Sequence, residues 1–222
     1  GAADVVPFIA LREFSQEDCA ALARSVRKRV GTELGQAVYL YDYAALREDR
    51  CTLPQVRRDR YEILQETITR DPSRAPDFGP AELGPAGAVA IGARGPLVAF
   101  TAFLDTSDAA VARAIATTIR ESGGGLPKVR ALGLFVNGRA QVSMNIIDFR
   151  VTGLFSALEA VRKEAARYGA TVTHTELVGL IPDEALVQAG LAALQLPSSA
   201  ANLILERRIG AINGDFSPIP FE

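Results

Sequence analysis

The chain has very little of the residue types that metal centres and disulfide-stabilised folds need. Its 222 residues contain no tryptophan, one histidine and two cysteines. Cys19 falls within a helical pattern and Cys51 within a predicted loop, so the pair matches neither the spacing of metal ligands nor a disulfide framework. We therefore expect no metal, and a core held together without disulfide bonds.

An excess of one charge and a long apolar run are also missing. The 24 basic and 26 acidic side chains give a formal net charge of −2, which provides no overall field to attract nucleic acid or an anionic membrane. The longest apolar run, Leu97 to Leu104, is far shorter than the roughly 20 residues of a membrane-spanning helix, and no secretory signal is visible. These absences predict a cytoplasmic protein that acts on small molecules.

The first part of the chain, residues 1–75, has the pattern of a β-α-β unit followed by a basic helix. A β-rich stretch (4–11) precedes a helix that starts with a capping box at Ser15 and Asp18, and a short strand (38–41) follows. Two strands and one helix are too little sheet to be stable alone. We therefore interpret this part as the closing half of a domain whose opening half either lies upstream of Gly1 or is replaced by a partner that covers the gap.

The last part, residues 97–222, contains strand and helix patterns in the order β-α-β-β-α-β. Strands are predicted at 97–104, 129–136, 140–147 and 171–178, and a second helix around 154–168. The first helix follows residue 104, is capped by Asp105 or Ser107, and ends at the glycine run 123–125. This run is either an anion-binding nest or, as we favour, a flexible connection to the next strand. The pair Asn137-Gly138 between the second and third strands is a strong hairpin signal. This order is that of a ferredoxin-like α+β fold, here complete, with both helices on one face of an antiparallel sheet.

Between these parts, residues 76–96 are rich in glycine and proline. Composition alone favours an interdomain linker. The alternative is an ordered loop, because glycines let the backbone approach a flat ligand closely and prolines hold its path rigid.

Polar side chains alternate with apolar ones in the predicted third strand of the last part. Gln141, Ser143 and Asn145 lie on one face, which is either solvated or the wall of a binding site. His174 is considered as a general base, but no partner for a catalytic triad is placed beside it by the sequence, so a surface position is favoured. Two basic clusters, at 24–29 and 57–60, fit the solvated sides of helices.

Six segments, in order along nearly the whole chain, resemble the formiminotransferase family, that is, glutamate formimidoyltransferase and the corresponding domain of formiminotransferase-cyclodeaminase. They are Gly1-Ala2-Ala3-Asp4-Val5-Val6-Pro7-Phe8-Ile9, Val38-Tyr39-Leu40-Tyr41, Asp77-Phe78-Gly79-Pro80, Gly92-Ala93-Arg94, Ala140-Gln141-Val142-Ser143-Met144-Asn145 and Glu176-Leu177-Val178-Gly179-Leu180-Ile181-Pro182.

The resemblance implies two ferredoxin-like subdomains, a folate-binding tunnel between them and a homodimer. It also implies transfer of the formimino group from N-formimino-L-glutamate to N5 of tetrahydrofolate, in histidine degradation. The family's folate-binding segment corresponds to Gly79, Pro80, Ala81, Glu82, Leu83, Gly84, Pro85, Ala86 and Gly87. Our own candidates for the tunnel wall are Gln141, Ser143 and Asn145.

Two departures from the family pattern concern function. The catalytic histidine of the family belongs to a His-Pro-Arg-Met segment immediately before Gly-Ala-Ala-Asp, so a chain that begins at Gly1 is expected to lack it and to be an inactive fragment. Thr101 and Phe103 stand where the family commonly has asparagine. The alternatives are a non-catalytic folate-binding or regulatory module, and an interaction domain that uses the polar sheet face.

Overall fold

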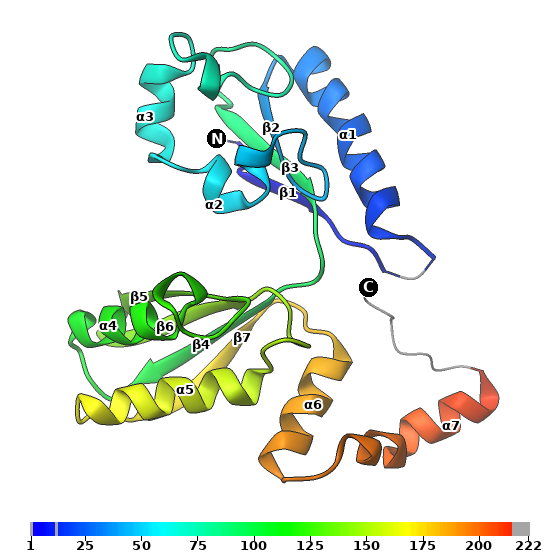
Figure 1. Cartoon of the computed structure of the whole chain (residues 1–222), viewed down its shortest axis with the longest axis vertical. Helices are drawn as coiled ribbons and strands as arrows, with labels where there is room; N and C mark the ends of the chain where they lie inside the picture. The colour runs from blue at the N-terminus through cyan, green and yellow to red at the C-terminus, as the bar shows by residue number, and fades with distance from the viewer. Residues whose placement is uncertain (1, 12, 215–222) are drawn as a thin grey trace. The chain divides into compact units, whose positions relative to one another are not determined.

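The computed structural model describes residues 2–11 and 13–214. The chain forms two compact units, the first ending at Gly95 and the second beginning at Pro96 (Figure 1), and each is described by itself. Over the described residues, no helix is both long enough and apolar enough to cross a membrane.

The first unit is built on a parallel three-stranded sheet in the order β1-β3-β2. Its strands are β1 (Val5–Phe8), β2 (Ala37–Asp42) and β3 (Ala88–Ala93). In the register, β3 lies between its partners, with Ala90 opposite both Val5 and Tyr39. Because helices cover both faces of this sheet, the strands are almost continuously apolar, as parallel strands usually are.

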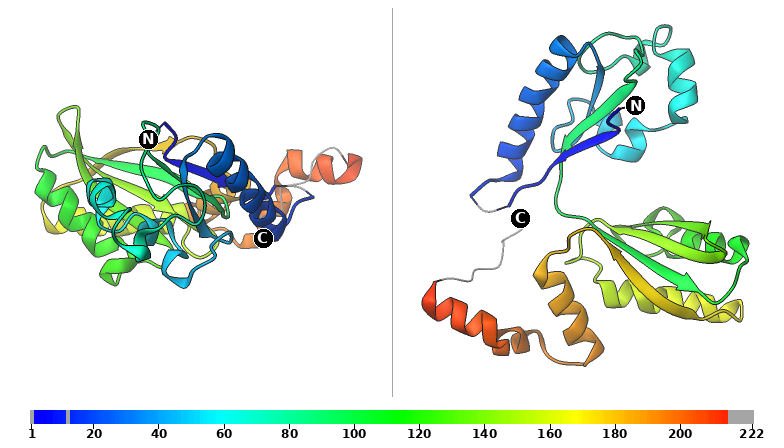
Figure 2. Two further views of the ribbon diagram at one scale, coloured as in Figure 1. Left: turned by 90° about the horizontal axis from the view of Figure 1, so that it is seen from above. Right: turned by 180° about the vertical axis from the view of Figure 1, so that it is seen from behind.

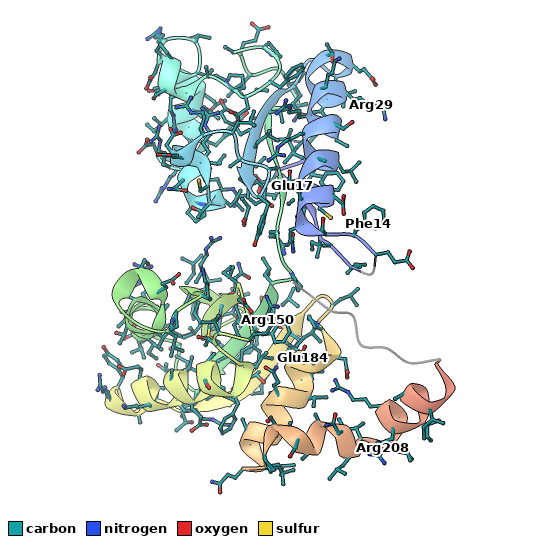
Figure 3. All side chains as sticks on the ribbon, turned by 45° about the vertical axis from the view of Figure 1, so that its right-hand side comes forward. Phe14, Glu17, Arg29, Arg150, Glu184 and Arg208 are labelled. Carbon is teal, nitrogen blue, oxygen red and sulfur yellow. The ribbon has the colours of Figure 1, made fainter. Side chains whose placement is uncertain are left out.

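One face of this sheet is covered by α1 (Gln16–Glu33). The predicted capping box is confirmed: the Asp18 backbone N–H donates to the Ser15 hydroxyl at 3.1 Å, and the Asp18 carboxylate accepts the Ser15 backbone N–H at 2.9 Å. Cys19, Ala20 and Ala23 are buried against the sheet. Arg29 projects from the helix into solvent (Figure 3), where it pairs with Glu33.

The opposite face is covered by short helical segments: η1 (Glu48–Arg50), α2 (Leu53–Val56), α3 (Arg60–Thr67) and η2 (Pro72–Arg74). The sequence predicts one basic helix from about residue 55 to 70, whereas the structure has a break in it. The break lies at Asp59 and Arg60, which have positive φ values of 65° and 62°. Two consecutive left-handed residues cannot continue a right-handed helix.

The segment predicted as a loop rich in glycine and proline, residues 76–96, contains β3, the central strand. The strand is hard to recognise because alanine and glycine, which favour strands little, make up most of it. The small residues have a packing role, since a Cβ at Gly92 would lie 2.5 Å from the Tyr41 ring.

The second unit confirms the predicted ferredoxin-like α+β fold. Its strands are β4 (Val98–Leu104), β5 (Val129–Val136), β6 (Arg139–Ile146) and β7 (Val172–Val178), in the order β5-β6-β4-β7 with every pair antiparallel. The helices α4 (Ala109–Ile119) and α5 (Leu154–Arg167) pack together against one face of this sheet (Figures 1 and 2).

The core of the second unit lies between these helices and every second residue of the strands. Val98, Phe100 and Ala102 of β4 alternate with residues that face away from the helices. Asn137 and Gly138 form the predicted hairpin turn with φ values of 50° and 80°. Gly133 lets α4 approach β5, because a Cβ there would lie 2.1 Å from a backbone nitrogen of α4.

Two details near α4 differ from the sequence-based prediction. The N-cap is Asp108, whose carboxylate accepts the Ala110 N–H at 2.7 Å, rather than Asp105 or Ser107. Asp105 instead joins the end of β4 to the start of β7, because its carboxylate accepts both the N–H (2.8 Å) and the hydroxyl (2.7 Å) of Thr171.

The glycine run at 123–125 connects α4 to β5 and overlaps η3 (Glu121–Gly123). It provides the connection favoured at the sequence level, with the Gly125 N–H donating to the Arg120 carbonyl at 3.1 Å. After β7 the chain continues through α6 (Asp183–Ala193), η4 (Ser198–Leu203) and α7 (Leu205–Asn213).

Candidate functional site

The candidate folate-binding loop, residues 79–87, is an ordered segment that leads into β3. At its start, Gly79 has a φ of 84°, and a Cβ there would lie 2.2 Å from the Gln36 carbonyl oxygen. Only glycine fits this conformation and this close contact. The loop therefore has a fixed entry point against the residue that precedes β2.

A tight turn ends the loop. The Gly87 N–H donates to the Gly84 carbonyl at 2.9 Å. The Ala86 carbonyl accepts two further hydrogen bonds, from the Gln36 side-chain amide (3.2 Å) and from the Ala2 N–H (2.9 Å). Ala81, Glu82 and Pro85 are exposed, whereas Leu83 packs against the cluster around Tyr39 and Ile68. The loop thus presents backbone and short side chains to solvent on a rigid support.

The segment before the loop is held by a buried ion pair. The Arg50 guanidinium lies 2.9 Å from the Asp77 carboxylate, and Asp77 also accepts the Leu40 N–H at 2.7 Å. The same guanidinium donates to the Ala75 carbonyl at 2.7 Å and lies over the Tyr39 ring. These contacts fix the loop to β2.

Tyr39 connects this network to η2. Its hydroxyl donates to the Arg74 carbonyl at 2.7 Å. Burial raises the pKa of Tyr39 to about 12, although the guanidinium groups of Arg50 and Arg74 oppose the shift. The phenol therefore remains a neutral hydrogen-bond donor throughout the neutral pH range.

A cavity of about 330 Å³ lies directly beside the end of the loop, between α2, α3 and the sheet. Ala88, the first residue after the loop, forms part of its wall together with Ala90 of the same strand. Apolar groups provide most of the lining, and Arg57, Arg60 and Arg74 provide positive charge. The predicted solvated cluster at 57–60 is confirmed, because Arg57, Arg58 and Arg60 are all exposed, and Arg57 and Arg60 also line this cavity.

In the second unit, the predicted polar face of β6 is present and carries no helix of that unit. Gln141, Ser143 and Asn145 alternate with residues buried under α4 and α5, so they lie on the opposite face. Ser143 is directly opposite Thr101 in the register, and Gln141 is opposite Phe103. Thr101 and Phe103, which stand where the family commonly has asparagine, are therefore cross-strand neighbours of the candidate wall residues Ser143 and Gln141.

The edge strand β7 adds a carboxylate and an imidazole to this face. Glu176 pairs with Thr101, which places Ser143, Thr101 and Glu176 in one row across three strands. His174 pairs with Phe103, and the two rings stack with centroids 4.3 Å apart. His174 is exposed, as the sequence-based interpretation favours.

The structure brings the residues of each predicted group together within one unit: 79–87 in the first, and 141, 143 and 145 in the second. The cavity and the row through Glu176 are not predictable from one sequence, because they depend on the break before α3 and on the strand register. Among the described residues, no group of three or more His, Cys, Asp or Glu side chains is arranged to hold a metal ion.

Comparison with protein families agrees with this two-unit α+β architecture. The model described as "Formiminotransferase domain, N-terminal subdomain" matches residues 1–94, and the model described as "Formiminotransferase domain" matches residues 99–203. The boundary between the matches coincides with the boundary between the units. The chain belongs to the formiminotransferase family, which consists of transferase enzymes.

Three relatives illustrate the similarity. A glutamate formimidoyltransferase of Thermoplasma acidophilum is 44% identical over 94% of this chain and 70% of its own length. One of Streptococcus pyogenes serotype M1 is 38% identical over 88% of this chain and 66% of its own length. Formimidoyltransferase-cyclodeaminase of Mus musculus is 40% identical over 85% of this chain. The chain spans only 36% of that longer protein.

Proposed function

We propose that the protein transfers a formimino group from N-formimino-L-glutamate to N5 of tetrahydrofolate, as a step of histidine degradation. The observation that carries this proposal is the similarity of both units to relatives named glutamate formimidoyltransferase. Tetrahydrofolate is then a substrate, and no metal is required by the chemistry.

The reaction needs positioning and two proton transfers. N5 of the folate attacks the amidine carbon and gives a tetrahedral intermediate. A base removes the proton from N5, and the glutamate nitrogen leaves as a protonated amine when its bond to that carbon breaks. Holding the two substrates in contact supplies much of the rate enhancement. The base in this proposal is the family histidine, expected immediately before Gly1, and this role is not transferred to His174.

We further propose roles for the two predicted groups. The loop 79–87 contacts the folate, which is supported by its fixed backbone and exposed short side chains. Gln141, Ser143 and Asn145 face the substrates, which is supported by their position on a sheet face without a helix. The amide and hydroxyl groups of this face donate and accept hydrogen bonds, as a folate or amidine ligand requires.

The test is an assay of the natural gene product for 5-formimino-tetrahydrofolate, with the sequence upstream of Gly1 determined from the gene. Activity that depends on a histidine encoded just upstream supports the proposal. Gln141→Ala is expected to lower kcat/KM about tenfold or more, because a buried ligand group loses its partner. Arg167→Gln, at an exposed arginine of α5, is the control and should leave the rate unchanged.

Two other outcomes of this assay would indicate that the protein has a different function. Folate binding without turnover indicates a non-catalytic folate-binding or regulatory module. Absence of any folate binding indicates an interaction domain. We also propose a homodimer located in the cytoplasm, which light scattering of the purified protein and cell fractionation test.

A further inference from the structure

The cavity beside the loop, in the first unit, has a largely apolar wall in which positively charged side chains outnumber negatively charged ones. Its volume of about 330 Å³ lies at the lower end of the range for small-molecule sites. Val56, Leu64 and Ala88 contribute aliphatic wall, and the rings of Tyr39 and Tyr61 contribute aromatic wall. Such walls favour a planar ring over a fully polar ligand, because a polar ligand would lose hydration without compensation.

The charged groups of the lining are three guanidiniums and one carboxylate. Arg57 pairs with the carboxylate, that of Asp4. Arg74 is buried and donates to the Arg58 carbonyl at 2.7 Å. Arg60 differs from both, because among the described residues its guanidinium has no hydrogen-bond acceptor and no ion-pair partner. The cavity therefore has a positive charge available for an anionic ligand group.

The loop ends where the cavity begins. Gly87 closes the tight turn, and Ala88 is already part of the cavity wall. Tyr39 belongs both to the wall and to the network that fixes the start of the loop. The loop and the cavity are therefore joined by residues of the same strands, Ala88 of β3 and Tyr39 of β2.

We propose that this cavity binds the p-aminobenzoyl-glutamate arm of a reduced folate, with the benzoyl ring against the apolar walls and a glutamate carboxylate at the Arg60 guanidinium. The inference rests on the proposed function and names the part of the folate that this site takes. N-formimino-L-glutamate has a carboxylate but no ring, so it leaves the apolar walls unused.

The experiment titrates the purified protein by calorimetry with p-aminobenzoyl-L-glutamate, with p-aminobenzoate and with N-formimino-L-glutamate. We expect p-aminobenzoyl-L-glutamate to bind most tightly. Arg60→Gln should raise its dissociation constant about tenfold, the effect of losing one charged hydrogen-bond pair. Tyr61→Leu should weaken p-aminobenzoyl-L-glutamate and p-aminobenzoate by the same factor, because both carry the ring.

Arg58→Gln is the matched control. Arg58 lies two residues before Arg60, but it pairs with Asp49 at 3.5 Å and does not line this cavity, so binding should be unchanged. Equal losses in the two arginine variants, or no detectable binding, overturn the proposal. Arg60-dependent binding that is tightest for N-formimino-L-glutamate also overturns it, since the cavity would then serve the formimino donor.

Failure of this proposal can be told from failure of the proposed function. If the protein catalyses formimino transfer and Arg60→Gln leaves the KM for tetrahydrofolate unchanged, the cavity assignment is wrong and the function stands. If p-aminobenzoyl-L-glutamate binds with the expected dependence on Arg60 but the natural gene product, with its upstream segment, catalyses no formimino transfer, the function is wrong and the ligand assignment stands. Circular dichroism of each variant establishes that it is folded.

Discussion

Arg50 and Asp77 form an ion pair of 2.9 Å in which each side chain is only 5% exposed. Its remaining hydrogen bonds go to the backbone: Asp77 accepts from Leu40 N–H, and Arg50 donates to the carbonyls of Ser73 and Ala75. The pair thus joins the central part of β2 to the segment that enters the candidate folate-binding loop. Because both charges are withdrawn from water, removing one partner leaves the other without compensation.

Asp77→Asn is therefore expected to lower the free energy of unfolding of the first unit by about 3–5 kcal/mol. Urea unfolding followed by far-ultraviolet circular dichroism measures the change. Asp49→Asn is the control, because its ion pair with Arg47 is more than one-third exposed and should contribute about 1 kcal/mol or less. Equal effects of the two substitutions would show that the buried Arg50–Asp77 pair contributes no more to the free energy of unfolding than the exposed pair does.

Gly79→Ala should destabilise the first unit by at least about 2 kcal/mol and weaken folate binding. The new Cβ would have to occupy space 2.2 Å from the Gln36 carbonyl oxygen, at a φ of 84° that alanine disfavours. Gly84→Ala in the same loop is the matched control, since a Cβ at Gly84 meets nothing within 4 Å. Thermal unfolding of both variants checks the stability prediction, which fails if the two are equally stable, and folate titration of Gly79→Ala checks the binding prediction.

Asp105 makes the second unit sensitive to acid. Its pKa lies below the usual range because its carboxylate accepts the N–H and the hydroxyl of Thr171. Folding favours the charged form, so the stabilisation is present above the ordinary aspartate pKa of about 3.9 and is lost as pH falls through the lowered value. In the unsubstituted protein, the protection of backbone amides at the β4–β7 junction against hydrogen exchange should fall with pH in this acidic range. In Asp105→Asn this protection should vary less with pH, after correction for the pH dependence of exchange in an unprotected amide.

Glu121→Gln is the control for that measurement, because Glu121 is an exposed carboxylate of η3 in the same unit. It should leave the acid dependence at the β4–β7 junction as in the unsubstituted protein. An unchanged acid dependence in Asp105→Asn would contradict the assigned role of the Thr171 contacts.

Asp59→Gly is expected to stabilise the first unit by about 1 kcal/mol. Asp59 has a φ of 65° and offers no side-chain cap to α3, so glycine relieves backbone strain at little cost. Its ion-pair contact with Arg74, at 3.8 Å, is solvent-exposed on the aspartate side and contributes little. Asp59→Ala should destabilise instead, and thermal unfolding of the two variants separates the backbone effect from the loss of the carboxylate.

Much of the second unit can be predicted from its sequence, because strong local signals agree with the final fold. The pair Asn137-Gly138 specifies a hairpin, and the alternation through Val142 and Met144 specifies which face of β6 is buried. These signals act over a few residues, so neighbouring sequence is sufficient to detect them. The first unit differs, because β3 pairs with strands that are distant in the chain and is composed mainly of small residues.

The candidate site is only partly predictable for the same reason. The resemblance identifies the loop 79–87, and alternation identifies Gln141, Ser143 and Asn145. The row through Glu176 depends on how β7 pairs with β4, which a single sequence does not specify. The cavity at Arg60 depends on the break at Asp59, where tertiary packing maintains two left-handed residues that local preferences disfavour.

The position of β3 between β1 and β2 also constrains the order in which the first unit is assembled. Among the described strands of this sheet, β1 and β2 do not pair with each other, and the ladder of each is formed with β3, which begins 46 positions after Asp42, at Ala88. During synthesis on the ribosome, neither β1 nor β2 can pair with β3 until Ala93 has emerged. At typical translation rates the apolar β2 waits several seconds for this pairing, which makes it a segment suited to recognition by a chaperone.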